Sequence, residues 1–156
     1  MPHPNPEYIS ELTGIVNNSP FPNHMSMKLV SIALDKAVIE LKTGHCHLQP
    51  FGIVHGGVFA TLVDTATFWA AFLRIPEEAG LVNIDLKLNY LQPFEKGLLR
   101  AAGSTIRSGN SISYAESSVL DENGKLIAHG TSTLMTLPGR GLTMSHSKFL
   151  PGGTNK

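Results

Sequence analysis

The chain has 156 residues and a mass of 16.8 kDa, which is about the size of one ordinary domain. Charged residues make up only 15% of it, against roughly 25% in typical soluble domains, so part of its surface is expected to lie in a subunit interface. Twelve basic residues balance twelve acidic ones, which excludes the basic field that binding to nucleic acid or a membrane by charge would need.

A short helix is predicted near the N-terminus. Residues 5–7, Asn-Pro-Glu, supply a capping side chain, a proline in the first turn and an acid at the positive end of a helix. Apolar residues follow at helical spacing until the pattern ends at residues 17–20, Asn-Asn-Ser-Pro. We expect this helix to cover one side of the domain.

Two strands and a buried helix are predicted next. The strands span residues 28–34 and 37–43, with a tight connection at Asp35-Lys36 between them. Residues 44–57 are irregular and rich in Gly and His. Residues 58–73, VFATLVDTATFWAAFL, are apolar on nearly every side and contain neither Gly nor Pro, which is typical of a buried helix.

The rest of the chain is predicted to be β-structure. Residues 83–90 alternate apolar and polar side chains, as a half-buried strand does. Further strands are expected over 98–107, 111–121 and 125–136, with a hairpin turn at 122–124. Consecutive strands favour an antiparallel sheet, so we expect an α+β fold in which one sheet wraps one long central helix. Residues 1–137 form the predicted domain, and the turn-rich residues 138–156 are predicted to be a mobile tail.

Asp64 is the one carboxylate inside the predicted buried helix. It lies too far into the helix to cap it, and an unpaired buried carboxylate is costly. Either another group pairs with Asp64, or its side chain faces a cleft. Thr61 and Thr65 lie on the same helix face. A structural role, in which the carboxylate pins a neighbouring loop, and a catalytic role are both open on these residues alone.

His55-Gly56-Gly57 stands where the buried helix begins. Two glycines allow a ligand to approach the backbone closely, and free N–H groups at the positive end of a helix suit an oxygen that becomes negative. The motif is weak alone, but with a carboxylate two turns later it supplies an electrophile-polarising site and a base or nucleophile. A metal site at residues 45–47, His-Cys-His, is not favoured because the chain has no matched ligands with zinc-like spacing.

Residues 49–72, QPFGIVHGGVFATLVDTATFWAAF, resemble the signature of hotdog-fold acyl-CoA thioesterases of the phenylacetyl-CoA thioesterase type. NIDLKLNYLQP (83–93) and RSGNSISYAESSVLDENGKLIAHG (107–130) resemble later parts of the same family. The resemblance implies a curved antiparallel sheet around the central helix and hydrolysis of acyl-CoA to free acid and CoA without a metal or cofactor. It also implies that two protomers join their sheets edge to edge, as a homodimer or a dimer of dimers, with composite active sites between them.

The resemblance also implies the roles of individual residues. The backbone N–H of Gly56 would hold the thioester carbonyl, and Asp64 of the other protomer would act as nucleophile or general base. His55 would be a supporting residue at the helix start. Gln49 stands where many family members have Asn, and Asn83 stands where a Ser is common. Both amides are candidates to orient water, the carbonyl or the carboxylate.

Candidate substrate contacts lie on the central helix, on the strand 83–90 and in the turn 107–111. The turn is expected to meet the CoA moiety, because a guanidinium and backbone donors suit a phosphate. The alternatives that Arg107 is a solvated charge at a strand end and that Phe68 belongs to the core are open on these residues alone. The candidates are Gly57, Thr65, Phe68, Asn83, Arg107 and Asn110.

Two other functions were weighed against the thioesterase. A non-catalytic acyl-CoA-binding hotdog domain is disfavoured because the first 27 residues are too short and not basic enough for the DNA-binding segment of such sensors. A hotdog dehydratase or hydratase is disfavoured because no clear Asp–His pair is present. No apolar run reaches the roughly 18 residues of a membrane span, and MPHPNPEY lacks the pattern of a signal peptide, so we expect a cytoplasmic protein.

Overall fold

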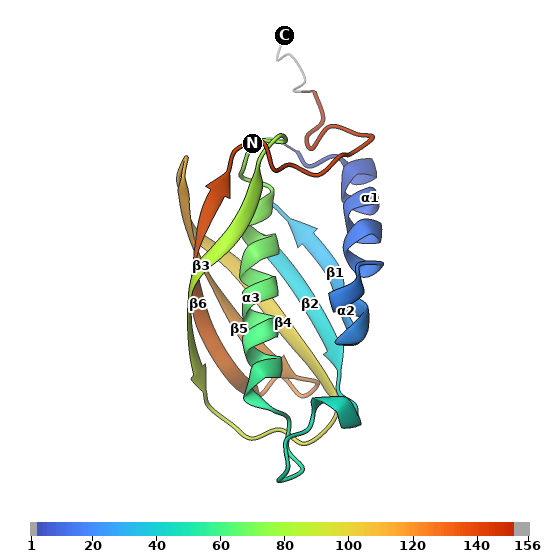
Figure 1. The fold of residues 1–156 in the computed structure, drawn as a ribbon, viewed down its shortest axis with the longest axis vertical. Helices are drawn as coiled ribbons and strands as arrows, with labels where there is room; N and C mark the ends of the chain where they lie inside the picture. Colours follow the sequence, from blue (N-terminus) through green and yellow to red (C-terminus); the bar gives the residue numbers. More distant parts are fainter. Residues whose placement is uncertain (1–2, 152–156) are drawn as a thin grey trace.

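The computed structural model describes residues 3–151. A six-stranded sheet curves around one long helix, α3, while α1 and α2 pack beside it against the edge strand β1 (Figure 1). In chain order, the helices and strands are α1 (Pro6–Asn17), α2 (Pro20–His24), β1 (Met27–Ala33), β2 (Lys36–Lys42), the 3₁₀ turn η1 (His45–His47), α3 (Gly56–Phe72), β3 (Gly80–Tyr90), β4 (Leu98–Ser108), β5 (Ile112–Asp121) and β6 (Leu126–Leu137).

The sheet has the strand order β1-β2-β4-β5-β6-β3, and every neighbouring pair is antiparallel. The predicted hairpin at 122–124 joins β5 to β6. There Gly124 has a φ of 79°, and the Asp121 carboxylate accepts the N–H groups of Asn123 and Lys125 at 2.9 and 2.8 Å. The strands at the two ends of this order, β1 and β3, are the edges of the sheet.

Helix α3 lies directly against the inner face of the sheet. Its one buried polar side chain, Thr67, donates its hydroxyl to the carbonyls of Val63 and Asp64 at 2.9 Å, as expected for a threonine inside a helix. A Cβ built at Gly103 of β4 would lie 2.1 Å from the carbonyl oxygen of Ala66, so the strand approaches the helix this closely only because residue 103 is glycine. The hotdog fold implied by the resemblance is confirmed.

The ends of the chain meet beside α1. Asn5 donates its backbone N–H to the carbonyl of Lys148 at 2.9 Å, and the Glu11 carboxylate accepts the N–H of Ser145 at 3.0 Å. The sequence did not predict these contacts, nor that Pro20 would begin the short helix α2. The predicted mobility of residues 138–156 stays a prediction, and residues 152–156 lie outside the described part of the chain.

Among the helices of residues 3–151, none has both the length and the apolar character needed to cross a membrane.

Candidate active site

The N-terminus of α3 presents one backbone N–H group that the helix does not use. The imidazole Nδ1 of His55, the N-cap, accepts the N–H of Gly57 at 2.8 Å, and the carbonyl of His55 accepts the N–H of Val58 at 3.0 Å. Within residues 3–151 the N–H of Gly56 has no such acceptor. Because the helix macrodipole makes this end positive, the Gly56 N–H is suited to hold an oxygen that gains negative charge.

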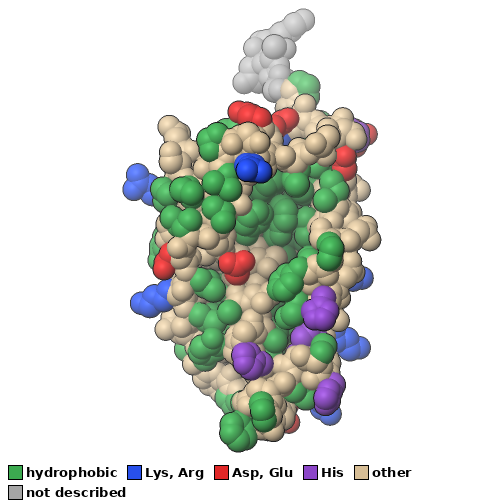
Figure 2. All heavy atoms as spheres, in the orientation of Figure 1, with side chains coloured by type: hydrophobic (Ala, Val, Ile, Leu, Met, Phe, Trp, Pro, Cys, Tyr) green, Lys and Arg blue, Asp and Glu red, His purple; other side chains and the backbone are tan. Residues whose placement is uncertain are grey.

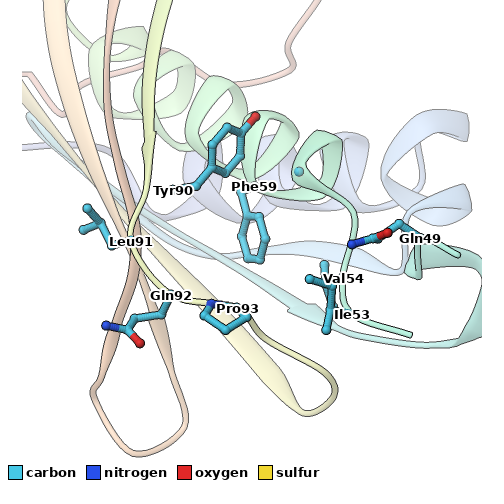
Figure 3. A pocket seen from close by; sticks show the side chains of 9 residues that line it. Gln49, Ile53, Val54, Phe59, Tyr90, Leu91, Gln92 and Pro93 are labelled. Carbon is cyan, nitrogen blue, oxygen red and sulfur yellow. The ribbon is translucent and has the colours of Figure 1, made fainter. Parts of the chain in front are cut away.

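A cavity of about 360 Å³ opens beside Gly56. Figure 3 shows its walls, which come from the loop before α3, the first turn of α3 and the end of β3. The lining residues are Gln49, Ile53, Val54, Gly56, Phe59, Tyr90, Leu91, Gln92 and Pro93. The sequence predicted only Gln49 and Gly56 among them.

A tight loop places Gln49 in this cavity. The N–H of Gln49 donates to the carbonyl of Ile53 at 2.8 Å, and its carbonyl accepts the N–H of Gly52 at 2.9 Å. Gly52 has a φ of 78°, which is a left-handed conformation that glycine adopts without strain. The side chain of Gln49 accepts the N–H of Phe51 at 3.3 Å, which leaves its NH₂ group without an acceptor among residues 3–151.

Asp64 lies half-buried in the middle of α3, and Asn83 of β3 pairs with it. The Nδ2 of Asn83 donates to Oδ1 of Asp64 at 2.8 Å and to Oγ of Ser132 at 3.0 Å. A β-bulge between Asn83 and Asp85 shifts the register of β3 here, and bulges of this kind re-aim a side chain. The sequence left open whether Asp64 was paired or faced a cleft, and the structure shows the pairing.

Two opposing effects set the ionisation of Asp64. Burial raises the pKa of this carboxyl above its ordinary value, and the hydrogen bond from Asn83 partly offsets that rise by stabilising the charged form. A carboxylate held in this way is a stronger base than a solvated one.

Thr61 and two further candidates, Thr65 and Phe68, share one face of α3 with Asp64. Thr61, Thr65 and Phe68 are each only half-buried, since this side of the helix is not covered by the sheet. The ring of Phe68 packs edge-on against Trp69, with centroids 4.8 Å apart. None of the three lines the cavity beside Gly56.

Arg107 and Asn110 lie at the opposite end of α3. They line a polar cavity of about 460 Å³ together with Asp35 and Arg74, and Arg74 follows the C-cap of the helix, Leu73. With 17 residues and a rise of 1.5 Å per residue, α3 is about 25 Å long. Within one chain, the predicted CoA-binding turn and the Gly56 N–H are therefore far apart.

In the His-Cys-His stretch at residues 45–47, the last histidine makes its hydrogen bonds within the protein. His47 is buried, and its Nδ1 accepts the N–H of Gly44 at 2.8 Å while its Nε2 lies 3.0 Å from the carbonyl of Met25. Across residues 3–151, no cluster of three or more His, Cys, Asp or Glu side chains is arranged to hold a metal ion.

The amino-acid sequence is similar to those of several known proteins. The family model of the thioesterase superfamily matches residues 51–128. The 1,4-dihydroxy-2-naphthoyl-CoA hydrolase of Listeria monocytogenes is 29% identical over 110 residues, which cover 70% of this chain and 89% of that protein. Acyl-coenzyme A thioesterase 13 of Homo sapiens is 31% identical over 107 residues, which cover 67% of this chain and 76% of that protein.

A solved structure of a thioesterase from Haemophilus influenzae superposes on this fold with a TM-score of 0.79 at 25% identity. The match covers 94% of this chain and all of the other, 100%.

Proposed function

Because the chain belongs to the thioesterase superfamily and is a thioester hydrolase, we propose that it hydrolyses acyl-CoA thioesters to a free acid and CoA. The names of two relatives, a 1,4-dihydroxy-2-naphthoyl-CoA hydrolase and an acyl-coenzyme A thioesterase, support this substrate class. The unshared N–H of Gly56 at the edge of a cavity is the observation that carries the proposal. That geometry suits a thioester carbonyl, whose oxygen becomes negative when the carbon is attacked.

In the proposed reaction, the Gly56 N–H holds the carbonyl oxygen and Asp64 acts as nucleophile or as general base toward water. Either route breaks the C–S bond, adds the oxygen of one water to the acyl carbon and releases CoA as a thiol. A thioester has a good leaving group, so one carboxylate and one oxyanion donor suffice. His55 keeps the first turn of α3 capped, Gln49 offers its free NH₂ group, and Asn83 holds the carboxylate.

One chain does not complete this site. Gly56 and Asp64 stand eight positions apart on a single helix, which separates them by about 12 Å along its axis. A reacting carbon has to lie about 3 Å from both groups, so we propose that Asp64 of one protomer meets Gly56 of its partner. The turn that contains Arg107 then reaches the CoA phosphates only in the assembled dimer.

Two surface features support a homodimer through β3. This edge strand has 11 residues, and its exposed side chains include Ile84 and Leu86. An unpaired edge of this length is a template for pairing with another chain. Figure 2 shows many hydrophobic side chains and few charged ones on the face that presents α3, with Lys and Arg mostly toward its outline. A dimer of dimers, a cytoplasmic location and the lack of nucleic-acid or membrane partners stay predictions.

Thiol release from a panel of acyl-CoAs tests the activity, and Asp64→Asn tests the mechanism. The variant keeps the shape of the side chain but removes the base, so we expect turnover to fall by a factor of at least about a hundred. Near-wild-type turnover of the folded variant would show that Asp64 is not the catalytic carboxylate.

Co-expression of Gln49→Ala and Asp64→Ala chains tests the shared site. If each single variant is nearly inactive and the chains mix freely, half of the dimers are mixed, and each mixed dimer has one intact site. Activity should then return to about a quarter of wild type. If both residues acted within one chain, a mixed population confirmed by mass would stay at the level of the single variants.

A further inference from the structure

Among residues 3–151, no charged side chain lines the cavity beside Gly56. Its polar side chains are the amides of Gln49 and Gln92 and the phenol of Tyr90, and the rest of the wall is aliphatic or aromatic. A carboxylate placed there would lose its hydration without gaining a cation, which is costly. The cavity is therefore suited to a neutral group.

The side chain of Tyr90 forms the part of the cavity wall that lies next to Gly56, the proposed oxyanion donor. A Cβ built at Gly56 would lie 3.1 Å from Cε1, Cζ and Oη of Tyr90, so the phenol packs on the α-carbon of Gly56. The ring also meets Phe59 edge-on, with centroids 6.3 Å apart and planes at 69° (Figure 3). Besides leaving its N–H accessible, glycine at position 56 makes room for Tyr90, because any larger residue would displace this ring.

The backbone around Tyr90 is firmly held. Tyr90 ends β3 in register with Ala128 of β6, and the N–H groups of Leu91 and Gln92 both donate to the carbonyl of Ile127, at 2.9 and 3.1 Å. A side chain on such a scaffold keeps its position better than one on a free loop. The ring is still 62% exposed, so its truncation should be tolerated by the fold.

We propose that Tyr90 determines acyl-group specificity and restricts the enzyme to compact, neutral acyl groups. The inference rests on the proposed function. The acyl chain begins at the carbonyl carbon that Gly56 is proposed to hold, and it must continue into the adjoining space. The CoA phosphates need cations, which this cavity lacks, whereas Arg107 lines a separate one. The phenol therefore meets the acyl group and limits its size.

The experiment measures kcat/KM of the purified protein with butanoyl-, dodecanoyl- and succinyl-CoA. Butanoyl and succinyl groups have the same chain length, but succinyl ends in a carboxylate. We expect the wild type to prefer butanoyl-CoA over succinyl-CoA by at least about a hundredfold. Tyr90→Ala should raise the dodecanoyl-to-butanoyl ratio by about tenfold or more, and Tyr90→Phe, which keeps the ring, should leave that ratio within about twofold of wild type. Phe21→Ala, which removes an exposed aromatic ring on α2, is the matched control and should change neither ratio.

Each other outcome has a distinct meaning. A change in kcat/KM that is uniform across the three substrates would place the ring against the CoA portion and overturn the role of Tyr90. Equal rates with butanoyl- and succinyl-CoA would overturn the restriction to neutral groups. A wild type that cleaves no acyl-CoA would refute the proposed function itself. Tyr90→Leu, which retains more apolar contact than alanine, repeats the comparison if Tyr90→Ala does not fold.

Discussion

The buried lysine near the C-terminus gives a quantitative prediction about stability. Lys148 is 1% exposed, and its Nζ donates to the carbonyls of Phe72 and Ile75 at 3.2 and 2.8 Å. Because Phe72 ends α3, the amine lies at the negative end of that helix. Burial lowers the pKa of Lys148 to about 8, although Glu77 and Glu78 oppose the change.

The shift in pKa has a definite sign for stability. The folded state loses the Lys148 proton near pH 8, whereas the unfolded state holds it up to the ordinary lysine pKa of 10.5. Between these values the unfolded state binds more protons, so the free energy of unfolding rises with pH. The full difference corresponds to about 3 kcal/mol, and about 2 kcal/mol of it falls between pH 8 and 10. Above pH 10, Tyr8 acts in the opposite direction, because burial and nearby acids raise its pKa to about 12.

Urea unfolding of the wild type and Lys148→Met at pH 8, 9 and 10 measures this effect at one fixed protein concentration. The variant removes the titrating group, so its stability relative to wild type should fall by about 2 kcal/mol over this range. Lys125→Met is the matched control, since that exposed side chain lies in the β5–β6 turn. If the difference in the free energy of unfolding between wild type and Lys148→Met stays constant from pH 8 to 10, the reasoning is refuted.

Three further predictions concern the site and the core. Asn83→Ala removes the hydrogen bond that lowers the pKa of Asp64, so the acid limb of the kcat profile should move to higher pH, and an unmoved limb would contradict the assignment. Arg107→Ala should raise KM for acyl-CoA more than it lowers kcat, and an unchanged KM at moderate salt would exclude the phosphate contact. Gly103→Ala places a Cβ 2.1 Å from a carbonyl oxygen of α3 and should lower the free energy of unfolding by about 1–3 kcal/mol, whereas Gly14→Ala, with nothing within 4 Å, should not lower it in the same thermal melts.

Much of the fold could be predicted because its elements carry their own periodicity. Strict alternation marks β3, and a segment that is apolar on nearly every side marks α3 as the central helix. The docking of residues 145–149 could not be predicted in this way. It depends on single contacts such as Ser145 to Glu11 and on one buried lysine, and neither has a repeating pattern. The bulge beside Asn83 was missed for the same reason, because it arises from strand pairing and not from local preference.

From the residues alone, the candidate site was predicted only where its chemistry is local, whereas Asn83 was named through the family resemblance. The His55-Gly56-Gly57 motif marks a helix terminus, and Asp64 supplies a carboxylate on the same segment. Both features can therefore be recognised in the sequence. Tyr90 comes from a strand 34 positions after Gly56, and its alternating neighbours identify it only as strand. Its contact with Gly56 exists because β3 ends beside the start of α3. A signal for it would have required that tertiary arrangement.

The proposed mechanism explains why such a site needs two chains. The oxyanion donor must lie at the first residue of α3, where N–H groups are free and the helix end is positive. The carboxylate must lie well inside the helix, where burial raises its pKa. A straight helix holds these two positions about 12 Å apart, so no rotation of the Asp64 side chain brings its carboxylate to a carbon that the Gly56 N–H also holds. In the proposed dimer, a second protomer in the opposite orientation supplies the missing half, and the low charged fraction of 15% agrees with the depletion of charged residues at the core of protein interfaces.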